Sequence, residues 1–181
     1  GYFGNKSGSG FYKSTKERNL PMSRSVQIAV MVAQEQSAVS ALLRAQLDEH
    51  QIPLDQAGLE RSVAEVVLRP ERGTILVAKQ AGHGLGPRQD IVGMAFLVYL
   101  WTPELGGLVA RLEELYVLPV LRGHGLGEQL VRASLNEARR VGCVAVDLEV
   151  EHSHARAANL YERLGFGVLP RRVFRRDLSR E

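Results

Sequence analysis

The chain has 181 residues, of which 45% are apolar and 24% are charged, and its formal net charge is +3 at pH 7. This length suits one domain with one core, and the composition excludes an intrinsically disordered protein. No apolar run approaches the roughly 18 residues that span a bilayer, and residues 1–21 lack the apolar centre of a secretory signal, so we expect no membrane association. With a single cysteine, Cys143, and no internal disulfide, the sequence predicts a cytoplasmic protein.

Residues 1–21 are rich in Gly, Ser and Lys, show no periodicity and precede Met22. We interpret them as a vector-derived tail, with a native disordered arm as the alternative, and residues 22–181 as the domain. The tail carries four basic residues and one acidic residue, so its net charge of +3 equals that of the whole chain. Because the domain itself is then neutral overall, the charge gives no support for nucleic-acid binding, which needs a basic face on the folded domain.

Hydrophobic periodicity predicts nine helices and strands, followed by a hairpin turned at Pro170. In chain order these are a strand at 26–33, helices at 37–50 and 54–68, strands at 74–80, 90–101 and 108–118, a helix at 128–142, a strand at 143–150, a helix at 154–166 and the hairpin at 167–178. Ser37 is the expected N-cap of the first helix, and Gly58 marks a break in the second. Strands that follow one another in the middle and alternate with helices near the end predict one α/β (α+β) domain with a mixed sheet.

The string GHGLG occurs twice, at 82–86 and at 123–127. The first copy is followed by Pro87 and another predicted strand, which favours an exposed hairpin loop. The second copy follows a strand and leads directly into a helix, whose first N–H groups have no internal partner. Those N–H groups, the positive end of the helix dipole and the forked guanidinium of Arg122 make the second copy a candidate pyrophosphate site. A tight strand-to-helix turn without a ligand is the alternative.

Two segments, LEELYVLPVLRGHGLGEQLV (112–131) and LEVEHSHARAANLYERLGF (148–166), share their pattern with a known family. The first resembles the acetyl-CoA-binding segment of the GNAT superfamily of N-acetyltransferases, and the second resembles a later strand-and-helix segment of the same family. The resemblance implies the GNAT fold, in which a mixed central sheet is flanked by helices. It also implies that the fourth and fifth strands, here 112–118 and 144–150, are parallel and splayed apart, with acetyl-CoA bound between them.

Carried over residue by residue, the resemblance implies cofactor contacts along the fourth strand and the glycine loop. These are Leu115, Tyr116, Val117, Arg122, Gly123, His124, Gly125, Leu126 and Gly127. The pantetheine would lie along the strand, the pyrophosphate would lie on the loop backbone, and the N–H of Val117 would donate to the developing oxyanion. The family's usual asparagine falls on His154 here, and Asn159 follows in the same helix. Both are candidate cofactor contacts.

Tyr161 matches the family tyrosine that acts as general acid beside the sulfur. Two candidates for the base stay open. Glu149 resembles the base of protein N-terminal acetyltransferases, and Glu113 resembles an acid of polyamine acetyltransferases, with the same strand parity as Leu115. Either would act best through a water, because a carboxyl pKa near ~4.3 lies far below the ~10.4 of an alkylammonium.

The expected activity is direct acetyl transfer from acetyl-CoA to a primary amine, either a small cationic amine or a protein N-terminus or lysine. Tyr99 and Trp101 are candidate walls of the acceptor pocket. His152 and His154 form a His-x-His pair, but no third ligand is apparent, and no metal is expected. The alternative is a non-catalytic acyl-CoA-binding regulatory domain, and a homodimer is left open.

Overall fold

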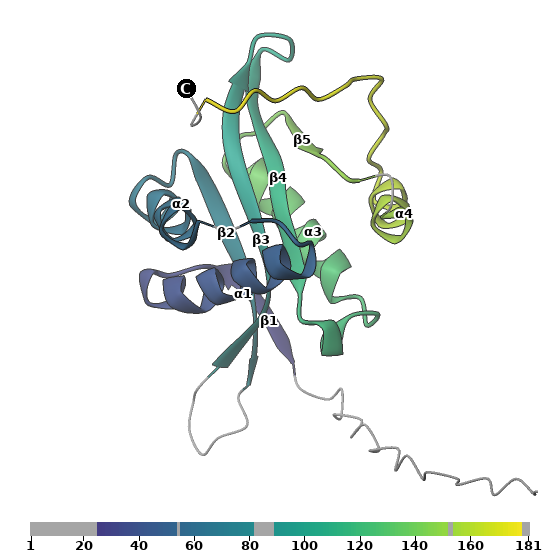
Figure 1. Ribbon diagram of the computed structural model, residues 1–181. Coiled ribbons are helices and arrows are strands. Elements are labelled where there is room, and N and C mark those ends of the chain that lie inside the picture. Colours follow the sequence, from purple (N-terminus) through teal and green to yellow (C-terminus); the bar gives the residue numbers. More distant parts are fainter. Residues whose placement is uncertain (1–24, 54, 82–88, 152–153, 179–181) are drawn as a thin grey trace, which may run out of the picture.

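The computed structural model describes residues 25–53, 55–81, 89–151 and 154–178, which form a five-stranded sheet ordered β1-β2-β3-β4-β5 (Figure 1). Neighbouring strands are antiparallel except for the last pair, β4 and β5, which is parallel. The strands are β1 (Val26–Val30), β2 (Gly73–Ala81), β3 (Gln89–Thr102), β4 (Gly107–Val117) and β5 (Ala145–Leu148). This confirms the predicted mixed sheet. The predicted tail boundary and the first GHGLG copy lie outside the described residues.

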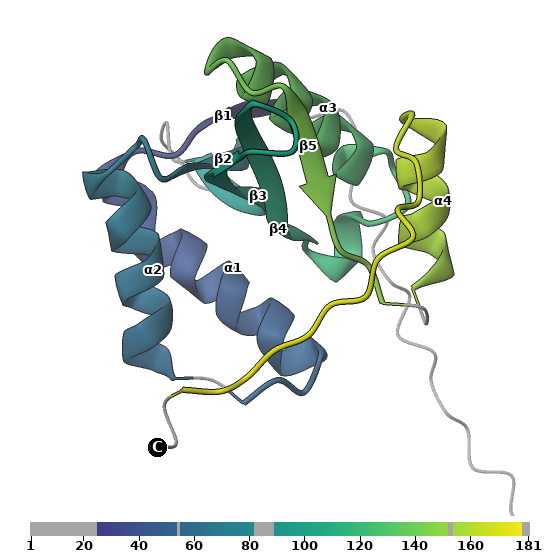
Figure 2. The same cartoon turned by 90° about the horizontal axis from the view of Figure 1, so that it is seen from above.

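Helices cover both faces of the sheet (Figure 2). They are α1 (Gln36–Glu49), α2 (Gln56–Leu68), α3 (Leu126–Arg140) and α4 (Ala155–Arg163), with single 3-10 turns η1 (Ala33–Glu35) and η2 (Pro119–Leu121). α1 and α2 lie on one face, α3 lies on the other, and α4 lies beside β5. In the part of the chain that the structure describes, no helix combines the length and apolar character needed to cross a membrane.

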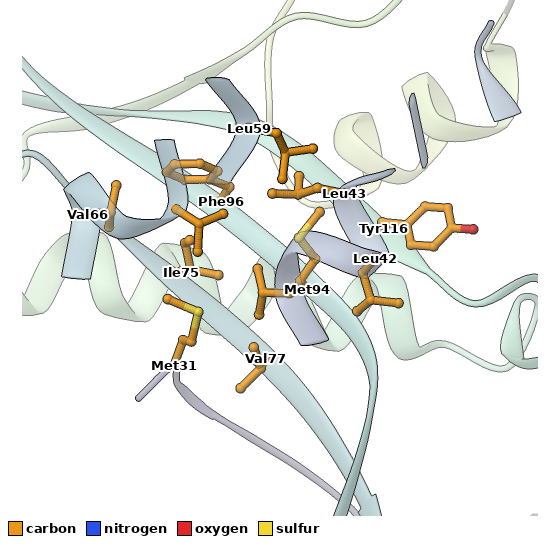
Figure 3. Close-up of a cluster of buried hydrophobic side chains, with 12 residues drawn as sticks. Met31, Leu42, Leu43, Leu59, Val66, Ile75, Val77, Met94, Phe96 and Tyr116 are labelled. Carbon is orange, nitrogen blue, oxygen red and sulfur yellow. The ribbon is translucent and has the colours of Figure 1, made fainter. Parts of the chain in front are cut away.

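Two hydrophobic clusters hold these layers together. The first packs α1 and α2 against the sheet and includes the fully buried Val39, Val63 and Met94 (Figure 3). The second packs α3 against the opposite face through Leu130 and Val131. The strands in the middle of the sheet are therefore apolar on both sides, which explains why they read as continuous apolar runs in the sequence.

Several predicted element boundaries are wrong. β1 ends at Val30 rather than at residue 33, and β5 covers Ala145–Leu148 rather than 143–150. Ser37 lies inside α1 rather than at its N-cap, because the chain is already helical in η1. α2 continues through Gly58 without a break, and Asp55 caps it by accepting the N–H of Ala57 at 3.1 Å. α3 begins at Leu126, before the predicted start at residue 128, because this buried leucine belongs to its first turn.

The predicted hairpin at 167–178 is also wrong, since these residues contain no strand. The segment instead runs from α4 back toward α2 (Figures 1 and 2), beside an opening of about 1100 Å³ next to β5. Pro170 has no N–H for a strand ladder, and Arg171 donates to the carboxylate of Glu104 in the β3–β4 turn. Phe174 is left 87% exposed, so the apolar side chains that a hairpin would have covered lie on the surface.

Candidate active site

The gap between β4 and β5 is the central feature of the site. The two strands pair only over Val109–Leu112 and Ala145–Leu148, and β4 continues beyond the end of β5, which confirms the predicted splay. Leu118 donates its N–H to the carbonyl of Val92 on the β3 side at 3.0 Å. Because backbone groups alternate in direction along a strand, the N–H of Val117 points away from β3 and into the gap.

The second GHGLG copy forms an exposed loop at the N-terminus of α3. Gly123 and Gly125 have φ of +86° and +81°, a conformation that glycine adopts without a Cβ clash. The first i→i−4 bond of the helix runs from the N–H of Gln129 to Gly125 at 3.0 Å, so the preceding N–H groups have no helical partner. A Cβ added at Gly125 or Gly127 would meet no atom of the described residues within 4 Å. The loop therefore combines unpaired donors with open space, which suits an anionic group.

Arg122, predicted as a phosphate ligand, forms hydrogen bonds with Glu49 and Val117 in this structure. Its Nη1 and Nη2 donate to the Glu49 carboxylate at the end of α1 at 2.6 and 2.7 Å, and its Nε donates to the carbonyl of Val117 at 2.8 Å. The guanidinium carbon lies 5.1 Å from the ring centroid of Tyr116. These contacts join α1 to the end of β4 beside the glycine loop. The contact of Arg122 with phosphate stays a prediction.

The hydrogen bonds from Arg122 hold the pKa of Glu49 below its ordinary value of 4.5, against the opposing effect of burial. A carboxyl whose pKa falls on folding stabilises the folded state above its ordinary pKa, and this stabilisation is lost as the pH falls through the lowered value. We therefore expect Glu49→Gln to lower the free energy of unfolding at neutral pH by at most about 1 kcal/mol, because the pair is partly exposed. Urea denaturation should show that this difference disappears on acidification. Asp48→Asn is the control, and a difference that persists in acid would contradict the assignment.

A cavity of about 220 Å³ lies where α1, β4, β5 and α4 meet. It brings together five of the predicted site residues, namely Glu113, Leu115, Glu149, His154 and Tyr161. The remaining lining residues are Gln46, Leu47, His50, Ile52, Leu112, Glu114, Val150, Glu151 and Ala157. The cavity therefore joins residues that lie more than a hundred positions apart in the chain.

Tyr161, the predicted general acid, projects from α4 into this cavity. Its ring is partly buried and packs edge-on against Phe166, with the ring centroids 5.7 Å apart. Burial raises the pKa of the phenol above its ordinary value. Tyr161 is consequently protonated throughout the neutral range, as a proton donor must be.

The two candidate bases lie on either side of Arg111 in β4. Nη1 of Arg111 lies 3.1 Å from Glu149 and its Nε lies 3.9 Å from Glu113. Both carboxylates thus face the same guanidinium. The Nε atom of Arg111 is buried without a hydrogen-bond partner within the described residues.

A third carboxylate, Glu114, is more deeply placed than either. β4 has a bulge opposite β3, because Phe96 pairs with Glu114 and the next residue, Leu97, pairs with Leu112. Glu113 is the extra residue, and Glu114 takes the α1 side of the sheet, where it accepts a hydrogen bond from Nε2 of Gln46 at 2.6 Å. Burial and the neighbouring charge of Glu113 raise the pKa of Glu114, against the hydrogen bond from Gln46.

The sequence interpretation missed Gln46, His50 and the special position of Glu114. A signal was present for the first two, because Gln46 and His50 fall at helical spacing on the apolar stripe of α1 that includes Leu43 and Leu47. Polar residues on a buried stripe indicate contacts beyond packing. The bulge that displaces Glu113 has no comparable local signal, and it makes the parity argument for Glu113 wrong.

The other predicted residues are placed as follows. His154 is the N-cap residue of α4 without a side-chain capping bond, and its ring packs edge-on against His50 with centroids 5.1 Å apart. Asn159 is exposed on α4 and does not line the cavity. Tyr99 donates to Thr74 at 2.8 Å, and Trp101 is 76% exposed, so neither forms a wall of the cavity.

The predicted His-x-His pair involves residue 152, which lies outside the described residues. Within residues 25–53, 55–81, 89–151 and 154–178, no group of three or more His, Cys, Asp or Glu side chains could hold a metal ion.

Comparison with known proteins finds relatives among acetyltransferases. The mouse thialysine N-ε-acetyltransferase is 31% identical over 105 residues, 57% of this chain and 52% of the mouse protein. The mycothiol acetyltransferase of Corynebacterium glutamicum (strain R) is 42% identical over 83 residues, 44% of this chain and 26% of that protein. The chain thus spans about half the length of the first relative and less of the second.

A likeness of fold comes from the solved structure of aminoglycoside N-acetyltransferase AAC(6′)-Iy in complex with CoA. It superposes with a TM-score of 0.71 at 18% identity, over 88% of this chain and 99% of the other. The pattern of the Acetyltransferase (GNAT) family matches residues 39–166, a range that contains the sheet from β2 onward, the glycine loop and Tyr161. The chain therefore belongs to the GNAT family of acetyltransferases.

Proposed function

We propose that this chain is an acetyl-CoA-dependent N-acetyltransferase that moves the acetyl group directly to a primary amine. The observation that carries the proposal is the gap between β4 and β5. At one end, β4 leads to the exposed glycine loop and the N-terminus of α3, and at the other the gap meets the cavity that contains Tyr161. A donor site for an anion and a proton donor thus lie along one strand edge.

The residues of this edge fit the cosubstrate. When bound, acetyl-CoA would supply an activated acetyl group on a thiol leaving group. The N–H groups from Gly123 to Gly127, together with the start of α3, would bind the pyrophosphate. The free edge of β4 at Leu115 would hold the pantetheine through backbone hydrogen bonds, because the backbone groups of Tyr116 face β3, and the N–H of Val117 would stabilise the oxyanion. His154 and Asn159 are proposed further contacts from α4.

The cavity side chains would move two protons. Tyr161 would give its proton to the departing sulfur, while Glu149 or Glu113 would accept the proton released by the attacking amine through an intervening water. The carboxylates of the cavity favour an acceptor that arrives as a cation. The relatives and the structural neighbour are named for thialysine, mycothiol and aminoglycosides, which supports an amine-bearing acceptor.

A screen for thiol release across small amines and peptides tests this function. We expect release only when acetyl-CoA and an amine are both present, and calorimetry should detect binding of acetyl-CoA but not of NAD. Tight binding of NAD, or no binding of acetyl-CoA, would overturn the proposal. Binding of acetyl-CoA without thiol release for any amine would instead support the alternative of a non-catalytic regulatory domain.

A further inference from the structure

The charges around the cavity are unbalanced. Among the described residues, its lining contains four carboxylates, from Glu113, Glu114, Glu149 and Glu151, and two imidazoles, but no Lys or Arg. Arg111, which stands behind the wall, contacts Glu149 and Glu113. Arg111 pairs with these two carboxylates and not with Glu114 among the described residues, and a concave surface lined mainly by carboxylates attracts cations.

Within the described residues, Glu114 forms no ion pair with a basic side chain. Its hydrogen-bond partner is the neutral amide of Gln46, and no basic side chain of the described residues contributes to its electrostatic environment. The raised pKa of Glu114 has the same origin, because burial and the nearby Glu113 both oppose its negative charge. A partly buried carboxylate in such a position is stabilised when an external cation reaches it.

Gln46 provides an independent indication of a ligand. The residue is only 9% exposed, and its Oε1 atom has no hydrogen-bond donor within the described residues. Nε2 of the same amide donates a hydrogen bond to Glu114. This bond fixes the amide beside the cavity that both residues line. A buried acceptor without a donor destabilises the folded protein. An N–H group that enters the cavity beside Glu114 would remove that destabilisation.

We propose that Glu114 and Gln46 form a subsite for a second positive charge on the acceptor, so that the preferred acceptor is a short aliphatic diamine. This inference rests on the proposed acetyl transfer, in which the first amine takes the acetyl group. The carboxylate of Glu114 binds the distal ammonium, and Oε1 of Gln46 accepts a hydrogen bond from one N–H of that ammonium. A cavity of about 220 Å³ is smaller than the roughly 300–1,000 Å³ of most ligand sites, which suits a slim alkyl chain.

The test compares cadaverine with n-pentylamine, two acceptors of equal chain length that differ in the second ammonium. Thiol release by the wild type should favour cadaverine. Glu114→Gln, which keeps the shape and removes the charge, should raise KM for cadaverine by about 10- to 30-fold with little change in kcat, and should leave n-pentylamine within about 3-fold. Glu60→Gln, an exposed acid on α2, is the matched control and should change neither. Equal losses for both acceptors, or no loss for cadaverine, would overturn the subsite.

Direct binding separates this inference from the proposed function. Calorimetry of cadaverine with the CoA-bound protein should show weaker binding for Glu114→Gln and for Gln46→Leu, with thermal melting to confirm that both variants are folded. If n-pentylamine is acetylated but neither variant weakens cadaverine binding, the subsite is wrong and the transferase activity stands. If no amine is acetylated, loss of cadaverine binding in the variants still supports the subsite, and absence of binding to the wild type overturns it.

Discussion

Gly125→Leu is expected to weaken acetyl-CoA binding by at least about 100-fold. At φ +81° the new side chain would project into the open space beside the first N–H groups of α3, where no protein atom lies within 4 Å. That space is the proposed position of the pyrophosphate. Loss of two hydrogen bonds to a charged group, each worth about 1.5–3 kcal/mol, accounts for a change of this size. Isothermal titration calorimetry with acetyl-CoA measures it.

Gly142→Leu is the matched control for this variant. Gly142 follows the other end of α3, has φ +85°, and also has open space where a Cβ would stand. Both substitutions therefore impose a similar backbone strain and should lower the melting temperature by similar amounts. Only the variant at Gly125 should lose cofactor binding. Equal affinities in the two variants would mean that the glycine loop does not hold the cofactor.

Tyr161→Phe is expected to lower kcat by about 100-fold and to leave the Kd of acetyl-CoA unchanged. The phenol is the proposed proton donor to the departing sulfur, and its burial keeps it protonated across the neutral range. The effect lies at the low end for general acid catalysis, because a thiol with a pKa near ~8.5 already leaves well. Steady-state kinetics with a saturating amine, together with calorimetry of acetyl-CoA, separates the two quantities.

Tyr99→Phe controls for the loss of a partly buried phenol. The pKa of Tyr99 is also raised by burial, but its hydroxyl bonds to Thr74, and the residue does not line the cavity. This variant should keep its turnover. An unchanged kcat in Tyr161→Phe would remove the acid role, and a parallel loss of cofactor affinity would assign Tyr161 to binding instead.

The sequence predicted the type and order of the elements through α4, because the relevant signals are local. Strands buried on both faces read as short apolar runs, and the stripe that includes Leu130 gives α3 its helical period. The errors concern the ends of helices and strands and the segment after α4, where tertiary contacts decide. Leu126 is drawn into α3 by burial, and the segment around Pro170 has helix-breaking and apolar residues typical of a hairpin but no strand to pair with.

The candidate site was predictable only where one continuous segment carries it. Tyr161 and the glycine loop each belong to a short pattern, so their positions beside the gap could be predicted from the order of residues in one segment. Gln46 meets Glu114 across 68 positions of sequence, and that contact depends on the docking of α1 and on a bulge in β4. Neither the docking nor the bulge produces a periodic pattern in the sequence. The contact between α1 and β4 at the cavity could therefore not be predicted from the sequence.

The brief pairing of β4 with β5 also determines how stability is distributed over the fold. The sheet up to β4 is enclosed by two cores, whereas neither β5 nor α4 contributes a fully buried side chain. Segments with few buried contacts open at a lower free energy than the core. A ligand in the gap would touch both sides and bind only the closed arrangement, so its binding free energy would be added to the folding of β5 and α4. A ligand bound in the active site would thus stabilise the packing of β5 and α4 against the rest of the sheet.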